Sequence, residues 1–138
     1  MPILLTDKMY SPALVGQNRD KMFVFGDNAE RVGMGGQACI RKCGNVIGVA
    51  TKISPTMEPT AFFDEENSLA GISLIALDLH EIAMSLKNGC TVVVPVDAVG
   101  NVSLGLGLAE LDTRAPTIYA FIVDTISRLS KQYGIGSF

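Results

Sequence analysis

The sequence predicts an α/β fold, as one three-layer domain over residues 1–138 with a mostly parallel central sheet and helices on both faces. Short β-branched or aromatic runs alternate along the chain with longer segments whose apolar residues recur at helical spacing. The segments that follow the apolar runs are long and glycine-rich, whereas those that lead into them are short. With 138 residues, 48% of them hydrophobic, the chain can bury one core without disulfides or metals.

Strands are predicted wherever a short run of β-branched or aromatic residues is bounded by turn-forming residues. The three clearest are MFVF (22–25), NVIGVA (45–50) and TVVVPV (91–96). The first residues, ILLT (3–6), are expected to add an edge strand.

Helices are predicted for three segments: QACIRKC (37–43), residues 64–88 and residues 113–134. Asp64 is expected to cap the second, because Glu65 and Glu66 then lie in its first turn, where the helix dipole favours acids. The third should begin near Thr113, with Pro116 in its first turn.

Charge and composition exclude several classes of protein. Residues 1–52 carry a formal charge of +3 and residues 53–138 carry −6, so the chain lacks the basic excess of proteins that coat duplex nucleic acid. No apolar run approaches the ~20 residues of a membrane span. The N-terminus lacks the features of a signal peptide. We therefore expect a cytoplasmic protein with neither nucleic-acid nor membrane partners.

The metal-ligand residue types are too few for a zinc site. Cys39, Cys43 and Cys90 form no disulfide framework, and the only histidine, His80, lies in a different apolar segment. Structural cysteines in a reducing compartment are the expectation, with no metal and no cofactor.

The loops after the strands are the expected site. Parallel sheets bind ligands at the carboxyl ends of their strands, and the loops 26–36, 51–63 and 97–112 should meet there. The first loop matches the G-x-G-x-x-A fingerprint, but seven residues separate Phe25 from Gly33, and the next strand ends at Thr51-Lys52 rather than near an acid. A classical NAD dehydrogenase is therefore not expected, whereas Lys52 suits a phosphate.

The third loop, DAVGNVSLGLGLAEL, is also glycine-rich. Ser103 and the amides around Gly105 and Gly107 can wrap a phosphate, and two such loops can hold the two halves of a nucleotide diphosphate. The alternative is that these glycines only make turns.

Two longer stretches carry a resemblance to a known family. FVFGDN followed by GMGGQACIRKCGNVIGVATK, and later VVVPVDAVGNVSLGLGLAELDTRAP, resemble a family of small uncharacterised domains found largely in bacteriophages. Its motifs are VFGDN, GxGGQA, a strand ending in PTK and a late glycine loop. This chain has Ala50 in place of the proline and an insert, VGNVSL, in the late loop.

That family is in turn distantly similar to macro domains, which bind ADP-ribose. The resemblance implies that Asn28 contacts ribose, that residues 33–36 lie near the distal ribose or a phosphate, and that residues 103–107 hold the diphosphate. Asp27 would contact adenine or act as a base. The implied ligand-binding residues are Gly26, Asn28, Gly33, Gly35, Gly36, Gln37, Lys52, Ser103, Gly105 and Gly107.

Three functions stay open on the sequence alone. The first is binding of ADP-ribose or a related nucleotide, with or without hydrolysis, for which Asp27, Asp97 and Asp112 are candidate bases. The second is a phage accessory protein that inhibits or modulates a host protein by direct contact in the host cytoplasm, through its acidic second half and exposed prolines. The third is an enzyme acting on another nucleotide or sugar phosphate.

Overall fold

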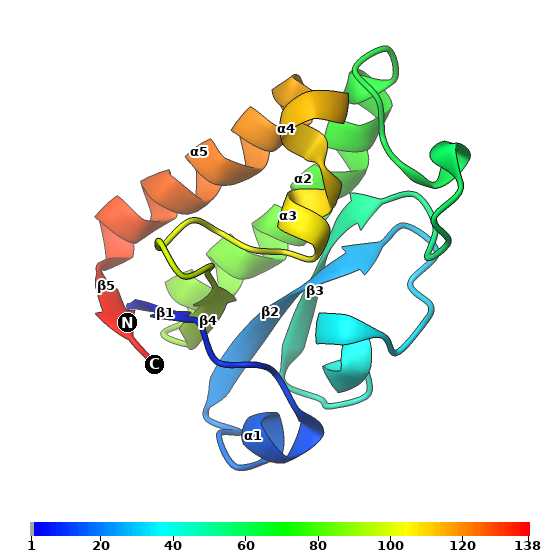
Figure 1. Cartoon of the computed structure of the whole chain (residues 1–138). Helices are drawn as coiled ribbons and strands as arrows, with labels where there is room; N and C mark the ends of the chain where they lie inside the picture. Colours follow the sequence, from blue (N-terminus) through cyan, green and yellow to red (C-terminus); the bar gives the residue numbers. More distant parts are fainter. Residues whose placement is uncertain (1) are drawn as a thin grey trace.

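The computed structural model describes residues 2–138, apart from the side chains of residues 106 and 107. Its centre is a five-stranded, all-parallel sheet in the order β3-β2-β4-β1-β5 (Figure 1). The strands are β1 (Ile3–Thr6), β2 (Lys21–Asn28), β3 (Val46–Lys52), β4 (Thr91–Pro95) and β5 (Ile135–Ser137). The predicted α/β fold with a parallel sheet is confirmed.

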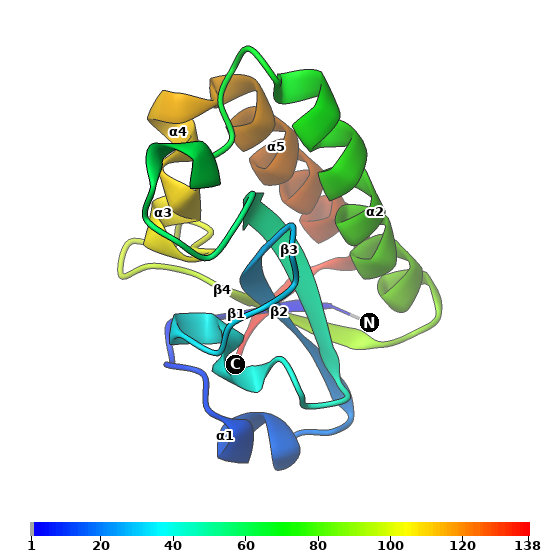
Figure 2. The same ribbon diagram turned by 90° about the vertical axis from the view of Figure 1, so that its right-hand side faces the viewer.

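Helices lie on both faces of this sheet (Figures 1 and 2). One face carries the long helices α2 (Ser68–Lys87) and α5 (Pro116–Tyr133), together with α3 (Leu106–Ala109) and α4 (Leu111–Arg114). The other carries α1 (Pro12–Gly16) and the 3₁₀ helix η1 (Gly36–Ile40). A second 3₁₀ turn, η2 (Pro59–Ala61), lies between β3 and α2.

The alternation of side chains along β2 divides the core into two clusters. Phe23 and Phe25 pack with Tyr10, Val15 and Ile40 on the α1 and η1 side. Val24 points to the opposite face and joins the larger cluster under α2 and α5. The sheet is therefore buried on both sides, which accounts for the near-continuous apolar runs of its strands.

The N-terminal strand corrects the sequence prediction, because β1 lies inside the sheet and not at its edge. It pairs with β4 on one side and with β5 on the other, and Ile3 is fully buried. The edge position belongs to β5, a short strand that the sequence did not predict, and α1 was not predicted either.

Helix boundaries also differ from expectation. Asp64 accepts a hydrogen bond from the Asn67 amide and so closes a turn before α2, which begins only at Ser68. The last predicted helix is two helices, broken at Ala115. The break has a local cause, because a residue that precedes a proline is driven out of the helical region.

Candidate functional site

The site begins where β2 and β4 separate. Strand β2 pairs with β3 as far as Asn28 but with β4 only over residues 21–23. Past that point, two side chains replace the missing strand: the Tyr10 hydroxyl donates to the Val24 carbonyl at 2.7 Å, and the Gln37 amide oxygen accepts from the Gly26 N–H at 2.9 Å. The sheet thus opens at its carboxyl end while its backbone groups stay hydrogen-bonded.

The connections that leave these two strands run to opposite faces of the sheet. From β2 the chain passes through η1 to β3, and from β4 it passes through α3, α4 and α5 to β5 (Figure 1). Neighbouring strands whose connections diverge in this way mark the point at which open parallel sheets bind ligands.

A cleft of about 360 Å³ lies at this point, and we name it the glycine cleft. It is lined by Gly26, Asp27, Asn28, Val32, Gly33, Gly35, Gly36, Gln37, Ala38, Thr51, Lys52, Pro55, Met57, Leu104 and Gly105. The three loops that follow β2, β3 and β4 therefore meet here. The volume lies within the usual range for small-molecule sites.

The loop after β4 packs directly against β2. A Cβ atom at Gly26 would lie 2.4 Å from the carbonyl carbon and oxygen of Leu104, so only glycine fits at this position. The Thr51 hydroxyl donates to the same carbonyl at 3.2 Å, and Gln37 donates to the Ser103 carbonyl at 2.8 Å. These contacts fix the loop after β4 against the ends of β2 and β3.

The glycines that line the cleft differ in what they require of the backbone. Gly33, Gly36 and Gly105 have φ values of 98°, 55° and 72°, in the left-handed region that favours glycine. Gly35 has an ordinary φ of −81°, and no heavy atom lies within 4 Å of where its Cβ would be. Neither backbone geometry nor internal packing therefore requires a glycine at position 35.

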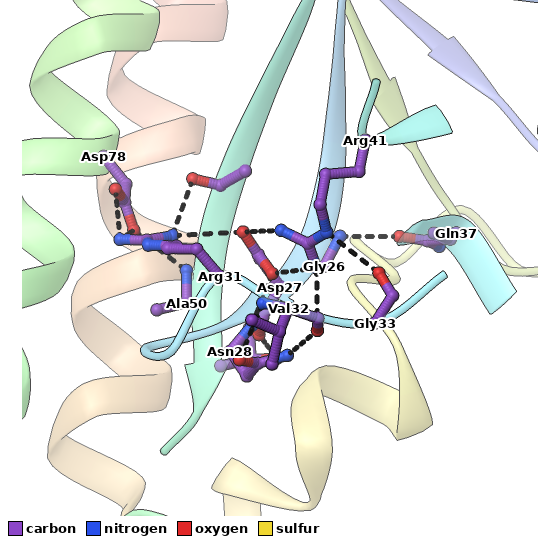
Figure 3. A network of polar contacts seen from close by, with 12 residues as sticks. Gly26, Asp27, Asn28, Arg31, Val32, Gly33, Gln37, Arg41, Ala50 and Asp78 are labelled. Carbon is purple, nitrogen blue, oxygen red and sulfur yellow. Dashed lines mark hydrogen bonds and ion pairs between the residues drawn. The ribbon is translucent and has the colours of Figure 1, made fainter. Parts of the chain in front are cut away.

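A chain of four charged side chains holds the loop after β2 in place (Figure 3). Arg41 binds both carboxylate oxygens of Asp27, at 2.9 and 2.6 Å. Arg31 approaches the same carboxylate at 3.4 Å through Nη1, and its Nη2 donates to both carboxylate oxygens of Asp78 in α2, at 2.8 and 2.9 Å. Because the charges alternate, the network places two buried acids inside the protein without leaving either of them unpaired.

The same network covers the free edge of β3. Arg31 donates to the Gly48 carbonyl at 3.4 Å, and Asp78 accepts from the Ala50 N–H at 2.9 Å. Both backbone groups point away from β2. The loop that carries the cleft glycines is therefore fastened to the edge strand and to α2.

This arrangement bears on the candidate bases. The side chain of Asp27 is 3% exposed, and its two oxygens accept hydrogen bonds from Arg41, Arg31 and the backbone N–H of Asn28. One Asp97 oxygen accepts from the amides of Val99 and Asn101, and exposed Asp112 lies on α4, away from the cleft. Asp27 is the only carboxylate among the described residues of the glycine cleft. Because its oxygens already accept hydrogen bonds from two arginines and a backbone N–H, it suits a structural role better than proton abstraction.

Two further predicted residues are turned partly inward. The side-chain amide of Asn28 donates to the Val32 carbonyl at 2.8 Å and so closes the loop that follows β2. The Lys52 ammonium donates to the Thr56 carbonyl at 2.5 Å and lies 4.6 Å from the centre of the Phe62 ring. Burial, with the positive charge of Arg114, holds the pKa of Lys52 below its ordinary value.

A second cleft, of about 260 Å³, adjoins the first at the carboxyl ends of β1 and β4, and we name it the β1 cleft. Its lining is Thr6, Asp7, Lys8, Met9, Tyr10, Gly36, Gln37, Pro95, Val96 and Ser103. Gly36 and Gln37 line both clefts, so the Gln37 side chain, held between Gly26 and Ser103, forms the wall between them.

The structure brings most of the predicted binding residues together. Those in the glycine cleft are Gly26, Asn28, Gly33, Gly35, Gly36, Gln37, Lys52 and Gly105. Ser103 lies in the β1 cleft, and Gly107 falls in α3, where its surroundings lie outside what the structure describes. For metals, the described residues contain no group of three histidine, cysteine or acidic side chains.

Sequence reasoning missed the residues that shape the site from outside the glycine loops. Tyr10 lies before β2, and Asp78 lies in the middle of a helix, so neither belongs to a local motif. A buried acid on the inner face of an apolar helix was the one available signal, because such a residue needs a partner.

Comparison with known proteins gives a family and no function. The profile of a family of unknown function, DUF7831, matches residues 5–125. The chain belongs to this family. The match runs from within β1 into α5, and therefore includes both clefts and the charge network. No curated protein and no solved structure matches the chain.

Proposed function

We propose that the glycine cleft binds ADP-ribose or a related nucleotide. The observation that carries the proposal is Gly35, which the fold itself does not require to be glycine. An open, unhindered backbone on the wall of a cleft allows a ligand to approach its amide closely, as phosphate-binding loops do.

The charge of the cleft favours an anion. The positive charges of Arg31 and Arg41 are balanced by Asp27 and Asp78. Lys52 differs, because among the described residues no carboxylate lies within 4 Å of its ammonium group. A phosphate at the cleft would supply the missing partner and raise the lowered pKa of Lys52.

The geometry favours binding over hydrolysis. Hydrolysis needs a group that orients a water and accepts its proton. Asp27 already accepts hydrogen bonds from two guanidinium groups. The setting inferred with this function is a phage-encoded, macro-like module in the host cytoplasm, and its support is the motif resemblance of the glycine loops.

A thermal-shift screen tests the proposal with ADP-ribose, NAD, AMP and ATP. A ligand at 100 times its dissociation constant adds about 2.7 kcal/mol, which is a shift of several degrees for a domain of this size. The expected result is a shift with a compound of the ADP-ribose type. If none of the four shifts the melting temperature, the protein-contact function becomes the better proposal.

Gly35→Val then locates the site. We expect the variant to fold normally and to bind the ligand at least tenfold more weakly. Gly16→Val is the matched control, because Gly16 also has open space at its Cβ position but lies at the end of α1, outside both clefts. Unchanged affinity in a folded Gly35→Val variant would place the ligand elsewhere.

A further inference from the structure

Helix α2 is more apolar than its packing in one molecule explains. An 18-residue window of it has a mean hydropathy of 1.5, yet only 33% of that window is buried. By length and composition it could cross a membrane, but here it packs against β3, β4 and α5, and its Asp78 pairs with Arg31. A helix with a second apolar face is expected to bury that face against something.

The outward side of α2 carries three exposed apolar side chains, and exposed Ser73, His80 and Glu81 lie between them in the sequence. Leu69, Leu77 and Met84 are 81%, 70% and 37% exposed. They are separated by eight and seven positions, which places them on one side of the helix. We name the surface formed by these three residues the α2 stripe; helix α2 itself runs along one side of the molecule (Figure 2).

We propose that the α2 stripe is the interface of a homodimer in which two α2 helices pack antiparallel across Leu77. The charges at the two ends of the helix select a second copy as the partner. Asp64, Glu65 and Glu66 precede the helix and are exposed, and Lys87 ends it. Antiparallel packing brings the Lys87 end of each copy to the acidic end of the other, so the attraction occurs twice.

The size of the stripe predicts a reversible dimer. A 20-residue helix is about 30 Å long, and a stable interface buries about 800 Å² per partner. We therefore include in the interface the groove beside the stripe, between α2 and α5. This groove, of about 260 Å³, is lined by apolar residues that include Ala83 and Phe121 and by polar ones that include Arg128 and Gln132. We expect micromolar affinity.

Sedimentation velocity over a range of protein concentrations tests the proposal. The wild type should shift from monomer to dimer as concentration rises, and Leu77→Glu should remain monomeric with an unchanged circular dichroism spectrum. Val99→Glu is the matched control, because Val99 is 80% exposed but lies in the loop after β4, and it should dimerise as the wild type does.

A charge exchange identifies the partner as a second copy in this orientation. Lys87→Glu and Glu66→Lys should each raise the dimer dissociation constant at least tenfold by placing like charges together. The double variant should recover an affinity within about threefold of the wild type, which a loss of folding could not produce.

Three outcomes overturn the inference: a wild type that is monomeric at every concentration, a dimer that survives Leu77→Glu, or a double variant that is weaker than both single ones. Flotation of the monomer with anionic vesicles would assign the stripe to a membrane surface instead. None of these outcomes bears on nucleotide binding, because the stripe residues line neither cleft.

Discussion

The two edges of β2 satisfy their backbone hydrogen bonds in different ways. Towards β3, backbone pairs with backbone to the end of the strand. Towards β4, pairing stops after Phe23, and Tyr10 and Gln37 take over the hydrogen bonds. The first side is continuous and carries its charge network on the outer edge. The second is open and carries the cleft.

The comparison shows that two strands of a buried sheet can separate only where other groups replace their backbone hydrogen bonds. Each backbone group freed by strand separation needs a partner, because an unpaired buried group costs about as much as a lost hydrogen bond. Side chains from distant parts of the chain meet that requirement here. The cleft therefore depends on residues that need never touch a ligand.

The largest effect should come from the charge network on the continuous side. Arg41→Ala leaves the Asp27 carboxylate, 3% exposed, with the longer contact to Arg31 as its only ion pair, beside the hydrogen bond from the Asn28 backbone N–H. Removal of one partner of a buried ion pair costs about 3 kcal/mol. Urea unfolding measures this loss. Arg19→Ala, at an exposed position, is the control and should change little. A loss below about 1 kcal/mol would mean that the network contributes little.

A smaller effect is expected on the open side from Tyr10→Phe. The change removes a buried hydroxyl and leaves the Val24 carbonyl without its partner, at a cost of about 1–2 kcal/mol. Tyr119→Phe is the control, because among the described contacts the Tyr119 hydroxyl makes no hydrogen bond. Equal stabilities of the two variants in urea would show that strand separation does not leave this carbonyl in need of a partner.

Gln37→Leu should cost less, about 1 kcal/mol, although it removes two hydrogen bonds. The freed groups of Gly26 and Ser103 border the clefts, where water can replace the amide. The variant also removes the polar wall between the two clefts, so any nucleotide affinity should change more than stability does. Calorimetric titration measures the first quantity and urea unfolding the second, with Gln17→Leu as the control.

The smallest effect concerns pH. The folded state lowers the pKa of Lys52 below its ordinary value of 10.5, chiefly through burial. The folded protein therefore releases this proton before the unfolded chain does. The resulting penalty is complete below the folded pKa and is relieved as pH rises from there towards 10.5.

Competitive acetylation measures this pKa directly. Lys52 should titrate below the ordinary lysine pKa of 10.5, and a phosphate-bearing ligand should move its pKa upwards. Titration of Lys52 at 10.5 or above in the free protein would contradict a buried ammonium group at the cleft.

Much of the fold was predictable because it rests on local pattern. The three apolar runs, the helical spacing of residues 68–87 and the glycine loops after the strands are visible in the sequence. The position of β1 was not, because nothing in ILLT says whether another strand pairs on its far side. That strand is β5, which is three residues long. It can pair with β1 only because α5 ends beside that strand.

The candidate site divides in the same way. The glycines, Asn28, Gln37 and Lys52 were predicted from the segments that follow strands together with the family resemblance. The roles of Asp27 and Arg31 were not, because they depend on Asp78, which is 47 residues beyond Arg31 in the sequence. An acid after a strand was interpreted as chemistry, whereas the fold gives it two guanidinium partners.

The cover that Arg31 and Asp78 place over β3 also has a consequence for the protein in a crowded solution. An uncovered edge strand invites a strand from a neighbouring molecule to extend the sheet, which is how many aggregates start. The contacts that shape the glycine cleft are the same ones that occupy the Gly48 carbonyl and the Ala50 amide. A substitution of Arg31 or Asp78 that loosens the loop around the cleft therefore also exposes the edge of β3. For such a variant, loss of ligand binding and loss of solubility should arise together.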